Sequence, residues 1–108
     1  MAMLEKNFQA ALIKELYSRF PGCMVFKMDA SYKQGIPDIL VLYNNKWAML
    51  ECKKNAFAHH QPNQDYYVDR LNGMSFSRFI FPENKEEVLD ELESALAPAG
   101  STCVSGGE

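Results

Sequence analysis

Residues 35–54 read GIPDILVLYNNKWAMLECKK, and this stretch predicts two β-strands joined by a turn of two residues. Residues 36–43 are rich in isoleucine, leucine and valine, and residues 46–52 contain tryptophan, methionine and leucine, so each run has the composition and length of a strand. Asn44 and Asn45 lie between the two runs. Because asparagine adopts a positive φ more readily than most residues, a primed turn fits there, and we expect a β-hairpin.

The turn also fixes which residues face each other across the hairpin. If Tyr43 pairs with Lys46, the same register places Asp38 directly opposite Glu51. Side chains alternate along a strand, so Lys53 points to the same face as both acids. Two opposed carboxylates repel each other unless a positive charge neutralises them, and a divalent cation would do so. A solvated strand end, with a salt bridge from Lys53 to one acid, is the simpler alternative.

Both faces of the predicted hairpin are apolar. One face carries Ile39, Val41, Ala48, Leu50 and Cys52, and the other carries Leu40, Leu42, Trp47 and Met49 beside the charged residues. Strands that are apolar on both faces belong at the centre of a sheet that is covered on both sides. We therefore expect the hairpin to be central. Charged groups at the end of such a hairpin are unusual and point to a function.

Hydrophobic spacing predicts the elements around the hairpin. Residues 3–20 repeat apolar side chains every four positions, as a core-facing helix does. A strand is expected over residues 23–28, a helix over residues 62–73 that ends at its glycine, and a strand over residues 75–81. Residues 84–87 resemble a capping box that opens a last helix.

Two of these helices carry polar residues close to their inner faces. Glu5 falls near the middle of the apolar stripe of the first helix, and Glu15 falls nearer its edge. An acid in the first turn also interacts favourably with the helix dipole, so a solvated Glu5 is an equal alternative. In the helix that starts at Pro62, Gln64 lies on the buried side, and Gln61 takes that role if the helix begins earlier.

The composition indicates one globular domain. With 108 residues and 47% hydrophobic content, the chain suffices for a single core, and we expect one domain over residues 1–97 and a flexible tail over residues 98–108. No apolar run has the length of a membrane span, and the first residues lack a signal peptide's apolar core, so we expect a cytoplasmic protein of a bacterium or a phage-infected host. Cys23, Cys52 and Cys103 lack metal-ligand spacing and are predicted to be reduced thiols.

The net charge of −3 conceals an uneven distribution of charge. Residues 83–108 contain seven acidic residues against Lys85 alone, whereas residues 1–82 contain ten basic and seven acidic residues. A basic face can therefore coexist with an acidic last helix. The charge balance permits a nucleic-acid ligand without requiring one.

The sequence contains Pro37-Asp38 and, thirteen positions after the aspartate, Glu51-Cys52-Lys53. This arrangement resembles the PD-(D/E)xK nuclease motif. Gly35-Ile36-Pro37-Asp38 is similar to the VRR-NUC and archaeal-type Holliday-junction-resolvase branches of that superfamily, and the order of elements over roughly residues 3–97 agrees. The resemblance implies an α/β fold: a restriction-endonuclease-like αβββαβ core with a mixed central sheet flanked by helices, plus a C-terminal helix.

The same resemblance implies a catalytic site. Its catalytic residues would be Asp38, Glu51, Lys53, Gln64 and Glu5. Mg²⁺, for which Mn²⁺ substitutes, would be held by Asp38, Glu51, the backbone carbonyl of Cys52 and Glu5. Lys53 would orient the attacking water and stabilise the developing negative charge. Glu15 and Gln61 remain the alternatives to Glu5 and Gln64.

The implied activity is divalent-metal-dependent endonucleolytic hydrolysis of DNA, selective for branched or junction structures. Resolution of a junction needs two active sites, so a homodimer is expected, with no membrane and no organic cofactor. Adjacent His59 and His60 are predicted to be solvent-exposed loop residues. The alternatives are a non-catalytic nucleic-acid-binding or assembly module on a nuclease fold, and a catalytic subunit that depends on a partner. The predicted DNA contacts are Tyr32, Lys33, Gln34 and Lys54.

Overall fold

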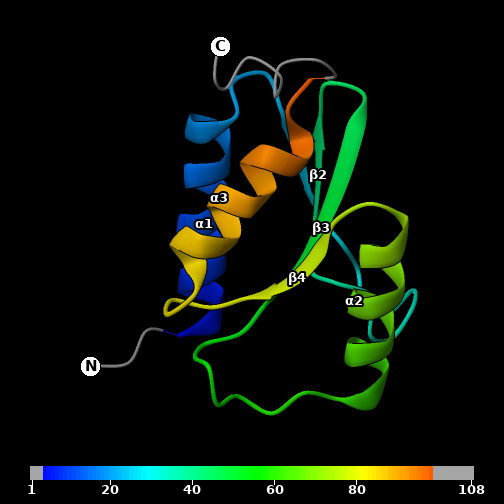
Figure 1. Cartoon of the computed structure of the whole chain (residues 1–108). Helices are drawn as coiled ribbons and strands as arrows, with labels where there is room; N and C mark the ends of the chain where they lie inside the picture. The colour runs from blue at the N-terminus through cyan, green and yellow to red at the C-terminus, as the bar shows by residue number, and fades with distance from the viewer. Residues whose placement is uncertain (1–3, 99–108) are drawn as a thin grey trace.

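The computed structural model describes residues 4–98, which form one four-stranded mixed sheet and three helices (Figure 1). The strand order is β1-β2-β3-β4, with antiparallel pairing of β1 to β2 and of β2 to β3, and parallel pairing of β3 to β4. The predicted αβββαβ core with a further C-terminal helix is confirmed. The elements are α1 Glu5–Arg19, β1 Met24–Lys27, β2 Ile39–Tyr43, β3 Lys46–Cys52, α2 Pro62–Met74, β4 Ser77–Ile80 and α3 Lys85–Leu96.

The hairpin of β2 and β3 has the predicted register. Tyr43 pairs with Lys46 and Ile39 pairs with Leu50, so one further step places Asp38 beside Glu51. Asn44, in the two-residue turn, has a φ of 58°, the positive value that the sequence suggested. The pairing of β1 with β2 and of β4 with β3 makes the hairpin central in the sheet, as expected.

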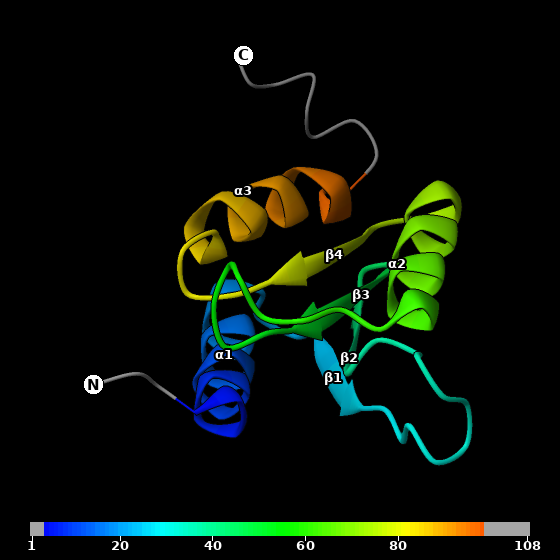
Figure 2. The ribbon, with the colours of Figure 1, turned by 90° about the horizontal axis from the view of Figure 1, so that it is seen from below.

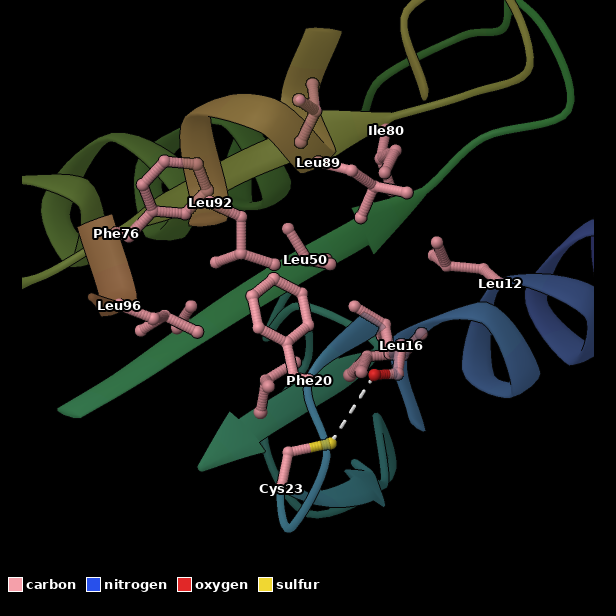
Figure 3. Close-up of a cluster of buried hydrophobic side chains, with 14 of the residues drawn as sticks. Leu12, Leu16, Phe20, Cys23, Leu50, Phe76, Ile80, Leu89, Leu92 and Leu96 are labelled. Carbon is pink, nitrogen blue, oxygen red and sulfur yellow. Dashed lines mark hydrogen bonds between the residues drawn. The ribbon is translucent and has the colours of Figure 1, made fainter. Parts of the chain in front are cut away.

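One face of the sheet holds the hydrophobic core. Helices α1 and α3 cover this face, with α1 over β1 and β3 and α3 over β3 and β4 (Figures 1 and 2). The predicted apolar stripe of α1 points inward from Phe8 onward, while Leu4 before it is exposed, and α3 also turns an apolar stripe inward. Figure 3 shows both stripes meeting the central strand around Leu50. Buried core residues include Phe8, Leu12, Leu16 and Phe20 of the first stripe, and Val88, Leu89, Leu92 and Leu96 of α3.

The opposite face is covered only in part, which corrects the expectation of two fully covered faces. Helix α2 packs on β3 and β4 (Figure 2). An α-helix is about 10 Å wide and strands lie about 4.8 Å apart, so one helix spans about two strands. Over β1 and β2 the apolar side chains remain exposed, by 54% for Met24, 44% for Phe26 and 36% for Leu42.

One predicted helix boundary and one predicted helix cap need correction. Helix α2 continues through Gly73 to Met74, and Gly73 has no positive φ, so it does not terminate the helix. Asn84 is the N-cap residue of α3 but makes no side-chain cap. Its amide instead closes the turn after β4, where Oδ1 accepts from the Phe81 backbone N–H at 2.8 Å and Nδ2 donates to the Phe79 carbonyl at 3.0 Å.

The predicted C-terminal tail is almost entirely outside the part of the chain that the structure describes. Apart from Pro98, the predicted tail of residues 98–108 lies outside the described residues, as does Cys103. The single domain over residues 1–97 stays a prediction. Within residues 4–98, none of the helices has the length and apolar character needed to cross a bilayer.

Candidate active site

Asp38 occupies the position immediately before β2, where two hydrogen bonds hold it. Its backbone carbonyl accepts from the Met28 N–H at 2.7 Å, which ties it to the end of β1. Its side-chain Oδ2 accepts from the Cys52 N–H at 3.0 Å, so the carboxylate spans from β2 to β3. Burial raises the pKa of this half-buried acid, while the bond from Cys52 and the charge of Lys53 oppose that rise.

Glu51 lies on the central strand β3 and is only 2% exposed. Its Oε2 accepts from Gln64 Nε2 at 3.0 Å, whereas its Oε1 is buried without a hydrogen-bond partner among the described residues. Burial raises the pKa of Glu51 to about 8, the charges of Asp38 and Glu5 add to the rise, and Lys53 opposes it. A buried carboxylate oxygen without a partner is costly, so this position favours a cation.

Lys53 points to the same side as Glu51, as the strand alternation predicted. Its Nζ donates to Gln64 Oε1 at 2.8 Å and to the His59 carbonyl at 3.0 Å, and it lies 3.9 Å from Glu51 Oε2. The residue is 6% exposed, so it is a buried ammonium with fixed partners. The simpler alternative, a charged strand end in solvent, therefore does not describe Glu51 and Lys53.

Gln64 connects the lysine to the glutamate, whereas Gln61 does not reach either. The Gln64 side chain donates to Glu51 and accepts from both Lys53 Nζ and the Gln61 N–H, the last at 3.0 Å. The Gln61 side chain in turn accepts from the backbone N–H of Gln64, which completes a capping box at the start of α2. Sequence reasoning missed this box, because glutamine is not one of the usual N-cap residues serine, threonine, aspartate and asparagine.

Glu5 and Glu15 lie in different surroundings. Glu5 is the first residue of α1, and its pKa is raised by partial burial and by the charge of Asp38, and lowered by Lys53 and Lys54. Glu5 therefore interacts electrostatically with the charged residues of this site. Glu15 instead pairs with Lys85 at 2.7 Å, between α1 and α3. Of the two acids considered, Glu5 alone belongs to the environment of the site.

A few oxygen atoms at this end of the sheet are suitable ligands for a metal ion. Among residues 4–98, no three His, Cys, Asp or Glu side chains are grouped closely enough to hold a metal ion together, so a direct bond from Glu5 stays a prediction. Mg²⁺ commonly takes one or two carboxylates and completes its shell with water and substrate phosphate. Asp38 and the unpartnered Oε1 of Glu51 fit that requirement, and the Cys52 carbonyl is the further predicted ligand.

The Cys52 thiol has no part in such a shell. Cys52 is fully buried on the core face, and burial together with the charges of Asp38, Glu51 and Glu5 raises the pKa of the thiol. A protonated thiol is a poor metal ligand, so only the backbone of Cys52 can contribute. Cys23 and Cys52 are both free, as predicted for the described cysteines.

The two loops beside these groups carry the predicted DNA contacts. Tyr32, Lys33 and Gln34 are exposed on the loop between β1 and β2, with Tyr32 exposed by 82%. Lys54 is exposed at the start of the connection from β3 to α2, and its charge reaches Glu5. Their contact with DNA stays a prediction.

His60 differs from the predicted solvent-exposed loop histidine. Its ring stacks on Phe79 with centroids 3.9 Å apart, and its Nδ1 lies 2.9 Å from Asp65 Oδ1. Through these two contacts, His60 holds the segment that connects β3 to α2 against both β4 and α2. The His59 side chain is exposed as expected, but its backbone carbonyl accepts from Lys53, a role that no sequence pattern signals.

Comparison with known proteins gives one informative result for this fold. No family model and no curated protein matches the sequence. A solved structure described as a VRR_NUC domain is similar, with a TM-score of 0.62 and 22% sequence identity, over 84% of this chain and 97% of that one. The chain therefore has the fold of a VRR_NUC domain, which confirms at the level of the fold the resemblance that the motif suggested.

Proposed function

We propose that this protein hydrolyses phosphodiester bonds of DNA with the help of a divalent metal ion. The observation that carries the proposal is the buried Oε1 of Glu51, which has no hydrogen-bond partner among residues 4–98. The register of the strand sets this residue beside Asp38. A fold without such chemistry has no need to bury Glu51 and Lys53 beside a half-buried Asp38, because each of these charges is costly to desolvate. Mg²⁺ is the proposed ion, with Mn²⁺ as its substitute.

Each residue of the site then has a defined task. Asp38 and Glu51 would hold a divalent ion, with the Cys52 carbonyl and Glu5 as further proposed ligands. When bound, such an ion would make water more acidic near neutral pH and would offset charge on the phosphate oxygens. Lys53 places positive charge beside the reacting phosphate, where charge develops in the transition state.

Gln64 keeps the lysine and the glutamate in place. Its single amide group contacts Lys53 Nζ at 2.8 Å and Glu51 Oε2 at 3.0 Å, and the first turn of α2 anchors it. Because an amide has one donor end and one acceptor end, both contacts can form only in one orientation. Gln64 is therefore a positioning residue, which keeps Lys53 from forming a shorter ion pair with Glu51.

The distribution of charge supports a nucleic-acid substrate at this end of the molecule. The acidic helix α3 lies on the opposite face of the sheet from α2 (Figures 1 and 2). Several of its acids are engaged there, since Arg19 pairs with Asp90 and Glu93, and Arg78 pairs with Glu91. DNA that approaches between the loops of Tyr32 and Lys54 is thereby separated from most of this negative charge.

Selectivity for branched DNA, and a homodimer that carries two sites, are the finer parts of the proposal. The described residues form a single sheet with three helices and add no second subdomain that would read a base sequence. A domain of this kind recognises the shape of DNA more readily than an extended sequence.

The direct test is cleavage of a panel of labelled DNA substrates. Linear duplex, single-stranded, flapped and four-way DNA would be incubated with the protein and Mg²⁺ or Mn²⁺, with EDTA as the control. We expect metal-dependent products, most abundant for a branched substrate. DNA binding without cleavage of any substrate, under any metal, would instead support a non-catalytic binding module.

A further inference from the structure

A cavity of about 540 Å³ lies between the loop from β1 to β2 and the start of α2. Four of the residues that line it have amide side chains, namely Gln34, Gln61, Asn63 and Gln64. The volume is within the range of about 300–1,000 Å³ that is usual for pockets that bind small organic groups. The predicted DNA contact Gln34 thus forms part of a concave surface and not merely of an exposed loop.

A close contact at Gly35 fixes the shape of this cavity. Gly35 has a φ of 93°, and a Cβ atom at this position would lie 2.7 Å from Asn63 Cγ. The side chain of Asn63 also donates from Nδ2 to the Gln34 carbonyl at 3.2 Å. The loop and the helix are therefore held together by a contact that only glycine permits, and the cavity beside that contact is a built feature.

The chemistry of the lining selects the class of ligand. Among the described residues that line the cavity, none has a charged side chain. The start of α2 offers a phosphate group the positive end of the helix dipole, but the lining has no arginine or lysine to form the charge-assisted hydrogen bonds of a usual phosphate site. Amide side chains offer both donors and acceptors in a plane, the arrangement that pairs with the edge of a nucleobase.

The cavity also adjoins the candidate active site. Gln64 belongs to the lining, and the same side chain contacts Glu51 and Lys53. A nucleotide whose base enters the cavity therefore brings its phosphates close to the lysine and the two acids. Bases inside a duplex are paired and stacked, and the cost of extracting one is lowest where it is already unpaired.

We propose that this cavity binds one unpaired nucleobase of the DNA strand whose neighbouring phosphate is cleaved, an inference that rests on the proposed nuclease function. The cavity then makes the unpaired nucleotide itself the feature that is recognised. Branch points, flaps and single strands present such a base, whereas an intact duplex does not. Selectivity for DNA structure follows without a further recognition domain.

The test measures DNA binding in EDTA, so that it does not depend on cleavage. One probe is a duplex with a single unpaired nucleotide, and the other is the same duplex with an abasic residue at that position. For the parent protein we expect the base to strengthen binding by about 10-fold, as one or two hydrogen bonds to a base edge would. In Ala30→Trp, which fills the cavity from the exposed loop, the two probes should bind equally.

Two further variants keep the result interpretable. Gln34→Ala removes one amide but leaves the backbone carbonyl that Asn63 contacts, so it should lose most of the preference for the base and keep the fold. Ala10→Trp places the same large side chain on an exposed position of α1, outside the cavity lining, and should keep the full preference.

The outcomes separate this inference from the proposed function. A parent protein that binds both probes equally, or neither, overturns the inference, as does an equal loss of preference in Ala30→Trp and Ala10→Trp. If the parent prefers the base and Ala30→Trp abolishes that preference, but no substrate is cleaved with Mg²⁺, the cavity assignment stands and the nuclease proposal fails.

Discussion

Replacing Glu51 by glutamine should stabilise the metal-free protein at alkaline pH. Burial and the neighbouring Asp38 and Glu5 raise the pKa of Glu51 to about 8 in the folded state, against an ordinary value of 4.5. The folded state therefore binds more protons than the unfolded state between these two values. Its free energy of unfolding must fall as the pH rises through this window. Glutamine has no charge to bury and retains an oxygen for the bond from Gln64.

The size of the effect follows from the pKa difference. Each pKa unit corresponds to about 1.4 kcal/mol, so ionisation of Glu51 costs the folded state up to roughly 5 kcal/mol above pH 8. Water that enters the metal-free site will reduce this, and we expect Glu51→Gln to be at least about 2 kcal/mol more stable than the parent at pH 9. For a domain of this size, that corresponds to at least about 8 °C in Tm.

Thermal unfolding in EDTA at pH 5.5 and pH 9 measures this difference. The parent should lose stability between the two pH values relative to Glu51→Gln, and the two proteins should differ less at pH 5.5, which lies nearer the lower end of the window. Glu83→Gln, which removes an exposed acid before α3, is the matched control and should follow the parent. A Glu51→Gln variant that is less stable than the parent at pH 9 would refute the reasoning, because the buried charge would then be stabilising.

Three further predictions concern the same groups. Calorimetric titration should show that Mg²⁺ binding strengthens by up to about 10-fold per pH unit from pH 6 to 8, because Glu51 must release a proton. Glu51→Gln should lose Mg²⁺ binding. In single-turnover assays, Lys53→Ala should slow cleavage by about 10²–10³. Lys54→Ala should mainly weaken binding and reduce its salt dependence, so equal rate losses for the two lysines would contradict their assigned roles. Gln64→Ala should slow the single-turnover rate and lower stability by about 1–3 kcal/mol, because it leaves buried Lys53 and Glu51 short of a partner. Gln61→Ala should lose only the cap, worth about 1 kcal/mol, and equal effects of the two glutamine variants on the rate would contradict a positioning role for Gln64.

The hairpin could be predicted from sequence because two local signals agreed. Strand alternation and the two-residue asparagine turn each specify a register, and a slip of one residue would have moved every apolar side chain to the wrong face. The observed pairing of Tyr43 with Lys46 follows from both signals. The position of Asp38 beside Glu51, and the face to which Lys53 points, follow from this register, whereas the burial of Lys53 also requires its contacts with His59 and Gln64.

Features that depend on tertiary contacts were not predictable in this way. Asn84 has the spacing of a cap, but the turn after β4 leaves the Phe81 N–H and the Phe79 carbonyl to be satisfied, and its side chain bonds to those groups. His60 is stacked on Phe79 because α2 and β4 converge there. Likewise, the number of strands that α2 covers depends on how the chain crosses the sheet.

The most direct test of the central claim is the single-turnover cleavage rate of Asp38→Ala beside that of the parent, with Mg²⁺ and whichever DNA the panel shows to be cut. The variant loses the side-chain bond from the Cys52 N–H but keeps the backbone bond from the Met28 N–H to the carbonyl of residue 38, so it should fold. Gel-shift titration at low salt should show equal or stronger DNA binding, because a negative charge near the phosphates has been removed. We predict that Asp38→Ala binds the DNA and does not cut it. Cleavage at the parental rate by the purified, folded variant would contradict the claim that Asp38 and Glu51 form the catalytic metal site.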